Sequence, residues 1–231
     1  ILSEFITSPA YTVGPLTTYK SEGYEKLIRD AIQLIGVEEP IETLKQFIAL
    51  SGMSHAGKIL NEDIIKQRNL LDHPMFIFNR MRKEINIENP KLKMNLWHDL
   101  HESLRPAAGH LEASIYRLRA TVEILFARFG SQIFLHSVEC GKVAEIATLC
   151  YAMYASSARA SRSYCIGLRN AEQELYLVNA LCFELHNQVK KLAVEIDHGE
   201  FVSTIHYYRQ VGQKLMESKK YNLEHPTTRN F

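Results

Sequence analysis

One long apolar stripe in the second half of the chain does most to limit the fold. Between residues 106 and 135, large apolar side chains recur at intervals of three and four, at Leu111, Ile115, Leu118, Val122, Leu125, Phe129 and Ile133. This spacing places them on one face of a long α-helix, whereas a half-buried strand would show alternation. Such a helix buries its apolar face against other helices. We therefore predict an all-α helical bundle.

The rest of the chain also shows helical periodicity, and we predict helices at residues 24–35, 41–60, 138–165, 170–189 and 200–221. The helix at 138–165 is predicted to turn four residues inward, Val143, Ile146, Cys150 and Met153. Its small residues are expected at close helix contacts: Ala152, Ala155, Ala158 and Ala160. Gly167 is expected to end this helix and Asn170 to cap the next one.

These elements suggest three regions, residues 1–60, 61–104 and 105–231. The middle region contains Pro74, Pro90 and several polar breaks, so we expect irregular structure there. Within it, residues 75–97 mix bulky apolar and basic side chains. Two interpretations remain open for this segment, a contact with a membrane interface and a short helix that packs on the protein or on a partner.

Composition excludes some functions and favours none. The chain has 231 residues, of which 46% are hydrophobic, so it can bury a substantial core. Its net charge of +1 provides no general attraction for nucleic acid. No apolar run is long enough to cross a bilayer, and the start at Ile1 suggests a processed or partial product. The four cysteines form no C-x-x-C pair and are expected as buried, reduced thiols: Cys140, Cys150, Cys165 and Cys182.

Three short motifs have structural explanations that we prefer. The segment 52–58 has the G-x-x-x-x-G-K spacing of a phosphate-binding loop, but a helix precedes it and Ile59 replaces the required hydroxyl, so we interpret its glycines as helix-packing positions. His98 and His101 lack further metal ligands, and no metal site is predicted. Arg159 and Arg162 are expected to form ion pairs with Glu174 or Glu184, with a partner protein as the alternative.

Two parts of the sequence resemble acyl-CoA dehydrogenases of the very-long-chain type. Residues 24–58 resemble the end of the catalytic domain in this family, and the motifs at 149–153, 157–163, 166–170 and 179–184 resemble its helical C-terminal extension. The resemblance covers about residues 24–60 and 105–231, and it implies that 1–60 is a remnant of the catalytic helical domain and 105–231 the extension.

The residues that the family uses for chemistry are largely replaced. By resemblance, Glu38 stands where the family has its catalytic base, but the following G-T-N turn reads Glu39, Pro40 and Ile41. Proline and branched side chains restrict a turn that has to approach the flavin closely. Gly14 is the one glycine that remains of a flavin-contacting L-G-G-x-G motif. We therefore expect no bound cofactor, and Glu38 is catalytic only if the chain is active.

The resemblance implies a role without catalysis. One relative in this family, family member nine, helps to assemble respiratory complex I, so we expect a mitochondrial scaffold on the matrix side of the inner membrane. Its expected partners are complex I assembly factors or subunits, and the candidate partner surfaces are the apolar helical faces around residues 40–60 and 106–190. A homodimer is also implied, and so is a peripheral inner-membrane contact through residues 75–97. The alternative is a FAD-dependent long-chain acyl-CoA dehydrogenase of fatty acid β-oxidation.

Overall fold

The computed structural model describes residues 41–68, 87–199, 205–220 and 227. The longer helices are α4 (Ile41–Arg68), α6 (Arg105–Phe129), α7 (Ser137–Cys165), α8 (Ala171–His198) and α9 (Ile205–Ser218). Three short 3-10 helices accompany them, η3 (Leu96–Asp99), η4 (Glu102–Leu104) and η5 (Gly130–Leu135). The described part of the chain contains no strand, and the all-α prediction is confirmed.

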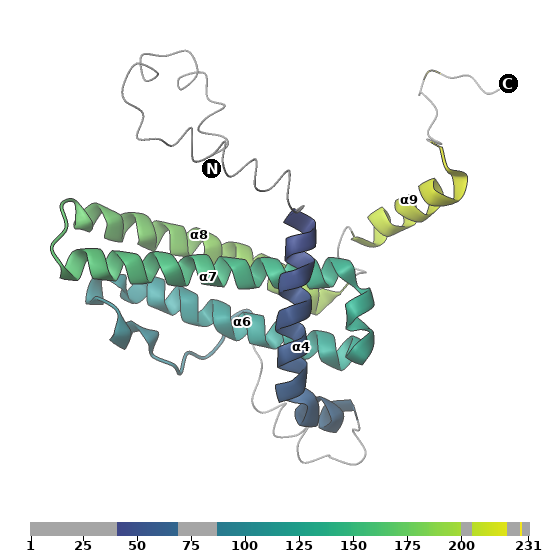
Figure 1. The fold of residues 1–231 in the computed structure, drawn as a ribbon, viewed down its shortest axis with the longest axis horizontal. Helices are drawn as coiled ribbons and strands as arrows, with labels where there is room; N and C mark the ends of the chain where they lie inside the picture. Colours follow the sequence, from purple (N-terminus) through teal and green to yellow (C-terminus); the bar gives the residue numbers. More distant parts are fainter. Residues whose placement is uncertain (1–40, 69–86, 200–204, 221–226, 228–231) are drawn as a thin grey trace.

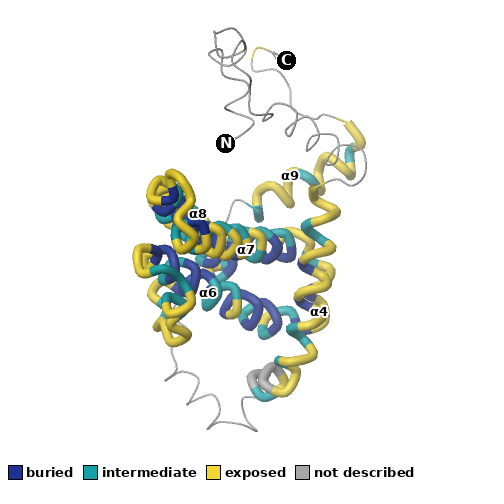
Figure 2. Tube along the Cα trace, turned by 60° about the vertical axis from the view of Figure 1, so that its left-hand side comes forward, coloured by how far each residue is buried: buried dark blue, intermediate teal, exposed yellow. Residues whose placement is uncertain are grey.

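Helices α6, α7 and α8 lie side by side and form the body of the fold, and α4 crosses α6 and α7 steeply on one side (Figure 1). The buried positions face the centre of this group (Figure 2). The largest fully buried apolar side chains come from all four helices and from η4 and η5, and they include Met53, Leu104, Leu125, Ile133, Ile146, Met153 and Val189. A single core therefore joins α4 to the three-helix body.

The predicted apolar stripe forms the inner face of α6. Leu111, Val122 and Leu125 are buried, and the stripe ends at the buried Ile133. The α-helix itself stops earlier, because Gly130 adopts a positive φ of 57° and the chain continues as η5. Glycine adopts this backbone conformation without the steric cost that a side chain adds.

Gly167 and Asn170, the residues predicted to end α7 and to precede α8, lie at the two ends of the α7–α8 connection. Gly167 has φ 72°, and the amide of Leu168 donates to the Ser163 carbonyl (3.0 Å), as in a Schellman helix end. Asn170 lies directly before α8 with φ 64°, but its side chain forms no capping hydrogen bond. Its main-chain carbonyl instead accepts from the amide of Gln173 (3.0 Å). The end of α7 and the start of α8 lie where the sequence predicted them, with Asn170 at the N-cap position, although α8 continues to His198 rather than ending near residue 189.

Two buried charged residues on α6 hold the segment before it. The Glu112 carboxylate accepts from the amides of Lys93 and Met94, both at 2.6 Å. Arg117 donates to the carbonyls of Ile87 (2.8 Å) and Glu88 (2.7 Å). Residues 87–95 lack regular structure, as predicted, because these side chains satisfy their backbone groups in place of a helix.

Several details differ from the predictions. Helix α4 continues to Arg68 rather than ending near residue 60. Of the small residues expected at helix contacts, Ala160 is buried, but Ala155 and Ala158 are exposed. Helix α9 begins at Ile205, and residues 24–35 and 200–204 lie outside the described part.

Candidate partner-binding surface

Helix α4 carries two apolar stripes, and only one of them is packed. Ala49 and Met53 are buried, and Ala56 and Leu60 pack against the same core. A second stripe runs along the neighbouring side of the helix at the same spacing of three and four, through Leu44, Ile48, Gly52, His55 and Ile59. In this second stripe Leu44 is 45% exposed, Ile48 43% and Ile59 69%. A helix that is apolar on both sides is normally covered on both sides.

The second stripe from Ile48 to Ile59, together with the packed stripe beside it, forms one wall of an open hollow of about 460 Å³. Its other walls are Ile115, Leu118, Arg119 and Val122 of α6 and Val143, Ala144 and Ala147 of α7. Among the lining residues, only His55 and Arg119 carry a polar side chain. A hollow of this size and composition falls in the range of ligand and peptide-anchor sites. We call the exposed stripe and the hollow together the α4 surface.

Specific contacts fix α4 against the body of the fold. Gly57 lies so close to α6 that a Cβ atom there would be 3.2 Å from the Phe126 ring. The side-chain amide of Gln46 donates to the Ser137 carbonyl at the start of α7 (2.8 Å). Lys45 lies 3.9 Å from the Glu145 carboxylate of α7. The hollow is therefore bounded by a helix held at several points along its length.

The rim of the α4 surface carries a paired cation. The Arg119 Nε donates to the Glu123 carboxylate one turn later (2.9 Å), while the Arg119 side chain remains 67% exposed. His55 stands across from it on α4 and also lines the hollow. The part of the chain that the structure describes places no carboxylate in the lining. A bound molecule with an acidic group near its apolar anchors would therefore match this rim.

A partly buried group of polar side chains, the His186 cluster, joins α6 to α8. It consists of His110, Ser114, Arg117 and His186. His186 Nδ1 lies 3.1 Å from the His110 carbonyl, and His186 Nε2 lies 3.5 Å from Arg117 Nη1. A neutral His186 satisfies both contacts by donating from Nδ1 and accepting at Nε2. Burial, together with the charge of Arg117, lowers the pKa of His110 and of His186.

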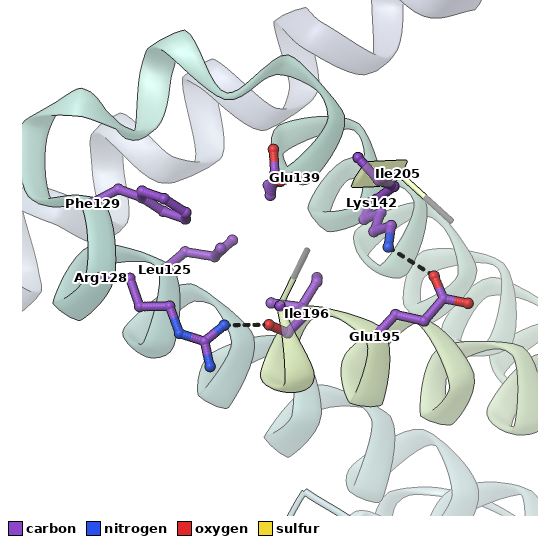
Figure 3. A pocket seen from close by; sticks show the side chains of 9 residues that line it. Leu125, Arg128, Phe129, Glu139, Lys142, Glu195, Ile196 and Ile205 are labelled. Atoms are coloured by element: carbon purple, nitrogen blue, oxygen red, sulfur yellow. Dashed lines mark hydrogen bonds and ion pairs between the residues drawn. The ribbon is translucent and has the colours of Figure 1, made fainter. Parts of the chain in front are cut away.

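A small polar cavity of about 30 Å³ lies between α6, α7 and α8 near the start of α9 (Figure 3). On one side Lys142 pairs with Glu195 (2.7 Å), and on another Arg128 donates to the Ile196 carbonyl (2.5 Å). Glu139 Oε2 accepts no hydrogen bond from the described residues, and His136 Nδ1 lies 3.8 Å from it. The cavity has room for about one water, and its charges balance, so we interpret it as structural.

The predicted catalytic and flavin-contacting residues, Glu38 and Gly14, lie outside the described residues, and so do residues 75–86. The glycine motif at 52–58 lies inside α4 and forms no phosphate loop. Gly57 occupies a close helix contact as predicted, whereas a Cβ atom at Gly52 would meet no atom of another element within 4 Å, and Gly52 lines the hollow.

The other candidate residues have structural roles. The His101 ring caps η4 by accepting from the Ser103 amide (3.3 Å), and the described residues contain no group of three metal-ligating side chains. Arg159 pairs with Glu174 (2.8 Å), which confirms one of the predicted ion pairs. Burial raises the pKa of the Cys150 thiol to about 11. Cys165, however, is exposed, so the prediction of buried thiols is wrong for this residue.

The α4 surface lies within the apolar faces at residues 40–60 and 106–190 that the sequence indicated as candidate partner surfaces. The recurrence of Leu44, Ile48 and Ile59 beside the packed stripe made α4 apolar on two sides. None of the described helices is long and apolar enough to cross a membrane. The second stripe is thus an exposed feature of a helix that packs on a bundle.

A family model described as "ACAD9/ACADV, C-terminal domain" matches residues 102–221 of this chain. The match runs from η4 through α9 and covers 120 of the 231 residues. It includes the motifs at 149–170 and 179–184, and it confirms the resemblance of this region to the helical C-terminal extension of the family, whereas residues 24–60 lie outside the match. Helix α4 precedes the matched region and packs directly on it.

Proposed function

The chain belongs to the ACAD9/ACADV family through its C-terminal domain, and on this premise we propose that it acts as a mitochondrial scaffold in the assembly of respiratory complex I. In this proposal it works on the matrix side of the inner membrane without catalysing a reaction of its own. The α4 surface is the docking site for a partner, and complex I assembly factors or subunits are the expected partners.

The observation that carries this proposal is the second apolar stripe of α4 and the hollow beside it. Exposed large apolar side chains that line a concave site favour binding of another molecule, because their burial removes apolar surface from water. The lining contains no nucleophile paired with a base, since His55 and Arg119 are its only polar side chains. These features support a binding site more strongly than an active site.

The shape and charge of the α4 surface suggest what the partner presents. A helix that places apolar residues at i, i+3 or i+4, and i+7 would match a stripe with the same spacing. An acidic residue near those anchors would face Arg119, whose side chain is two-thirds exposed. A rim charge of this kind mainly improves selectivity and the rate of association, and the apolar anchors supply most of the affinity.

The experiment is affinity purification from mitochondria with the wild-type chain and with two matched variants. Ile59→Glu places a charge in the hollow, and Leu177→Glu changes a side chain of equal exposure on α8 (69% and 70%). We expect the wild type and Leu177→Glu to recover complex I assembly factors or subunits, and Ile59→Glu to lose them. A single charge in an apolar anchor site should weaken binding by at least about tenfold.

The same preparations test the dehydrogenase alternative, which depends on Glu38 and Gly14. A yellow chain with copurified flavin that oxidises a long-chain acyl-CoA would support that alternative and contradict the proposal. Recovery of no complex I protein by the wild type would also contradict it. Unchanged circular dichroism of both glutamate variants would show that the substitutions leave the bundle folded.

A further inference from the structure

Helix α9 is the most amphipathic helix of the described part, and none of its residues is buried. It extends away from the bundle in both views (Figures 1 and 2). Its apolar side chains nevertheless follow helical spacing at Tyr208, Val211 and Leu215, and the adjacent Ile205 and Met216 widen the same face. Tyr208 is 72% exposed and Met216 80%. Within the part of the chain that the structure describes, the apolar face from Tyr208 to Met216 is therefore exposed, while Ile205 is half-buried.

The segment that contains α9 is basic, although the chain as a whole is almost neutral. Residues 205–220 contain four cations, Arg209, Lys214, Lys219 and Lys220, and one carboxylate, Glu217. Their net charge is +3, whereas the whole chain carries +1, so all other residues together carry −2. Several positive charges therefore lie close to the exposed apolar face in the sequence.

The cations occupy the positions that a flat anionic surface requires. At 100° per residue, Arg209 lies at one edge of the apolar face and Lys214 lies beyond the other edge, next to Tyr207. Lys219 and Lys220 follow directly after the helix. Long basic side chains at these edges can bury their stems along the apolar layer and keep their charges at the headgroups, and tyrosine suits the same boundary.

We propose that α9 is a peripheral membrane-binding helix that lies in the interface of a bilayer containing anionic lipids. Its apolar face enters the acyl boundary, and Lys214, Lys219 and Lys220 contact the negative headgroups. This site is distinct from residues 75–97 and independent of the α4 surface. A second copy of the chain is a poorer occupant for α9, because the hollow presents Arg119 and His55 to an already basic helix.

The test is flotation of the full chain with vesicles of phosphatidylcholine alone and with vesicles that also contain phosphatidylserine. The wild type is expected to float only with the anionic vesicles, and less as the salt concentration rises. Leu215→Glu should abolish flotation, because it places a charge in the centre of the apolar face. The double variant Lys219→Gln/Lys220→Gln should bind more than about tenfold more weakly.

Two control variants on α8 show whether a loss of flotation is specific to α9. Leu177→Glu and Lys191→Gln change exposed residues of the same types and should float as the wild type does. The proposal is wrong if the wild type floats with neither vesicle or equally with both, or if Leu215→Glu floats unchanged. It is also wrong if the α9 variants alter the oligomeric state in size-exclusion chromatography instead of vesicle binding, since a second copy would then be the occupant.

Discussion

Glu112 provides the sharpest test of how α6 holds residues 87–95, the irregular segment that precedes it. The residue is 2% exposed, and its carboxylate accepts from the amides of Lys93 and Met94 at 2.6 Å and of Leu96 at 3.4 Å. A hydrogen bond to a charged group contributes about 1.5–3 kcal/mol. Lys93 and Met94 are themselves exposed, so water can partly replace the carboxylate and the lower value applies. The two short hydrogen bonds, at about 1.5 kcal/mol each, together contribute about 3 kcal/mol, and we expect Glu112→Ala to lower the free energy of unfolding by this amount.

The variant Glu112→Gln keeps an acceptor oxygen but loses the charge, so it should cost about 1 kcal/mol. Urea unfolding measures both changes, with Glu184→Ala, an exposed residue of α8, as the control. Native-state hydrogen exchange should show faster exchange at the amides of Lys93 and Met94 in Glu112→Ala. If this variant unfolds within about 0.5 kcal/mol of Glu184→Ala, the carboxylate does not hold the segment.

Three further predictions follow from local geometry. Gly52→Ala should stabilise the chain by up to about 1 kcal/mol in thermal unfolding, because the new methyl group meets no other atom, whereas Gly57→Ala should gain less because its methyl group would press on an aromatic ring. The His186 cluster has lowered histidine pKa values, so the unfolded chain binds more protons below about pH 6.5. Stability should therefore be constant above that pH and fall as the pH drops below it, and His186→Gln should reduce the slope; an unchanged slope would refute this origin. In the native protein, iodoacetamide should modify Cys165 much faster than Cys150, and equal rates in mass spectrometry would contradict the buried position of Cys150.

Helical periodicity predicted the body of the fold well, because α6, α7 and α8 each have one buried face. The stripe from Leu111 to Ile133 marked the inner face of α6, and the four inward positions of α7 are all buried. Gly167 marked the end of α7 because a positive φ suits glycine. These features depend on local backbone preferences and on burial, which the order of residues records directly.

The contacts between distant segments could not be predicted in this way. The pairing of Glu112 with the amides of residues 93–96 depends on where an irregular segment passes α6. Asn179 of α8 accepts from the Ala107 amide (3.2 Å) and so caps α6 from another helix. No local pattern marks such partners. The hollow likewise exists only because α4 crosses α6 and α7, and its residues are far apart in the sequence.

The most direct test of the scaffold proposal is hydrogen exchange of the chain with and without a complex I assembly factor recovered by the wild type. The proposal predicts slower exchange along α4 between Leu44 and Leu60 and at the facing positions of α6 and α7. The outer positions of α8 around Leu177 should exchange as before. Slower exchange confined to α8, or none at all on α4, would contradict docking at the α4 surface.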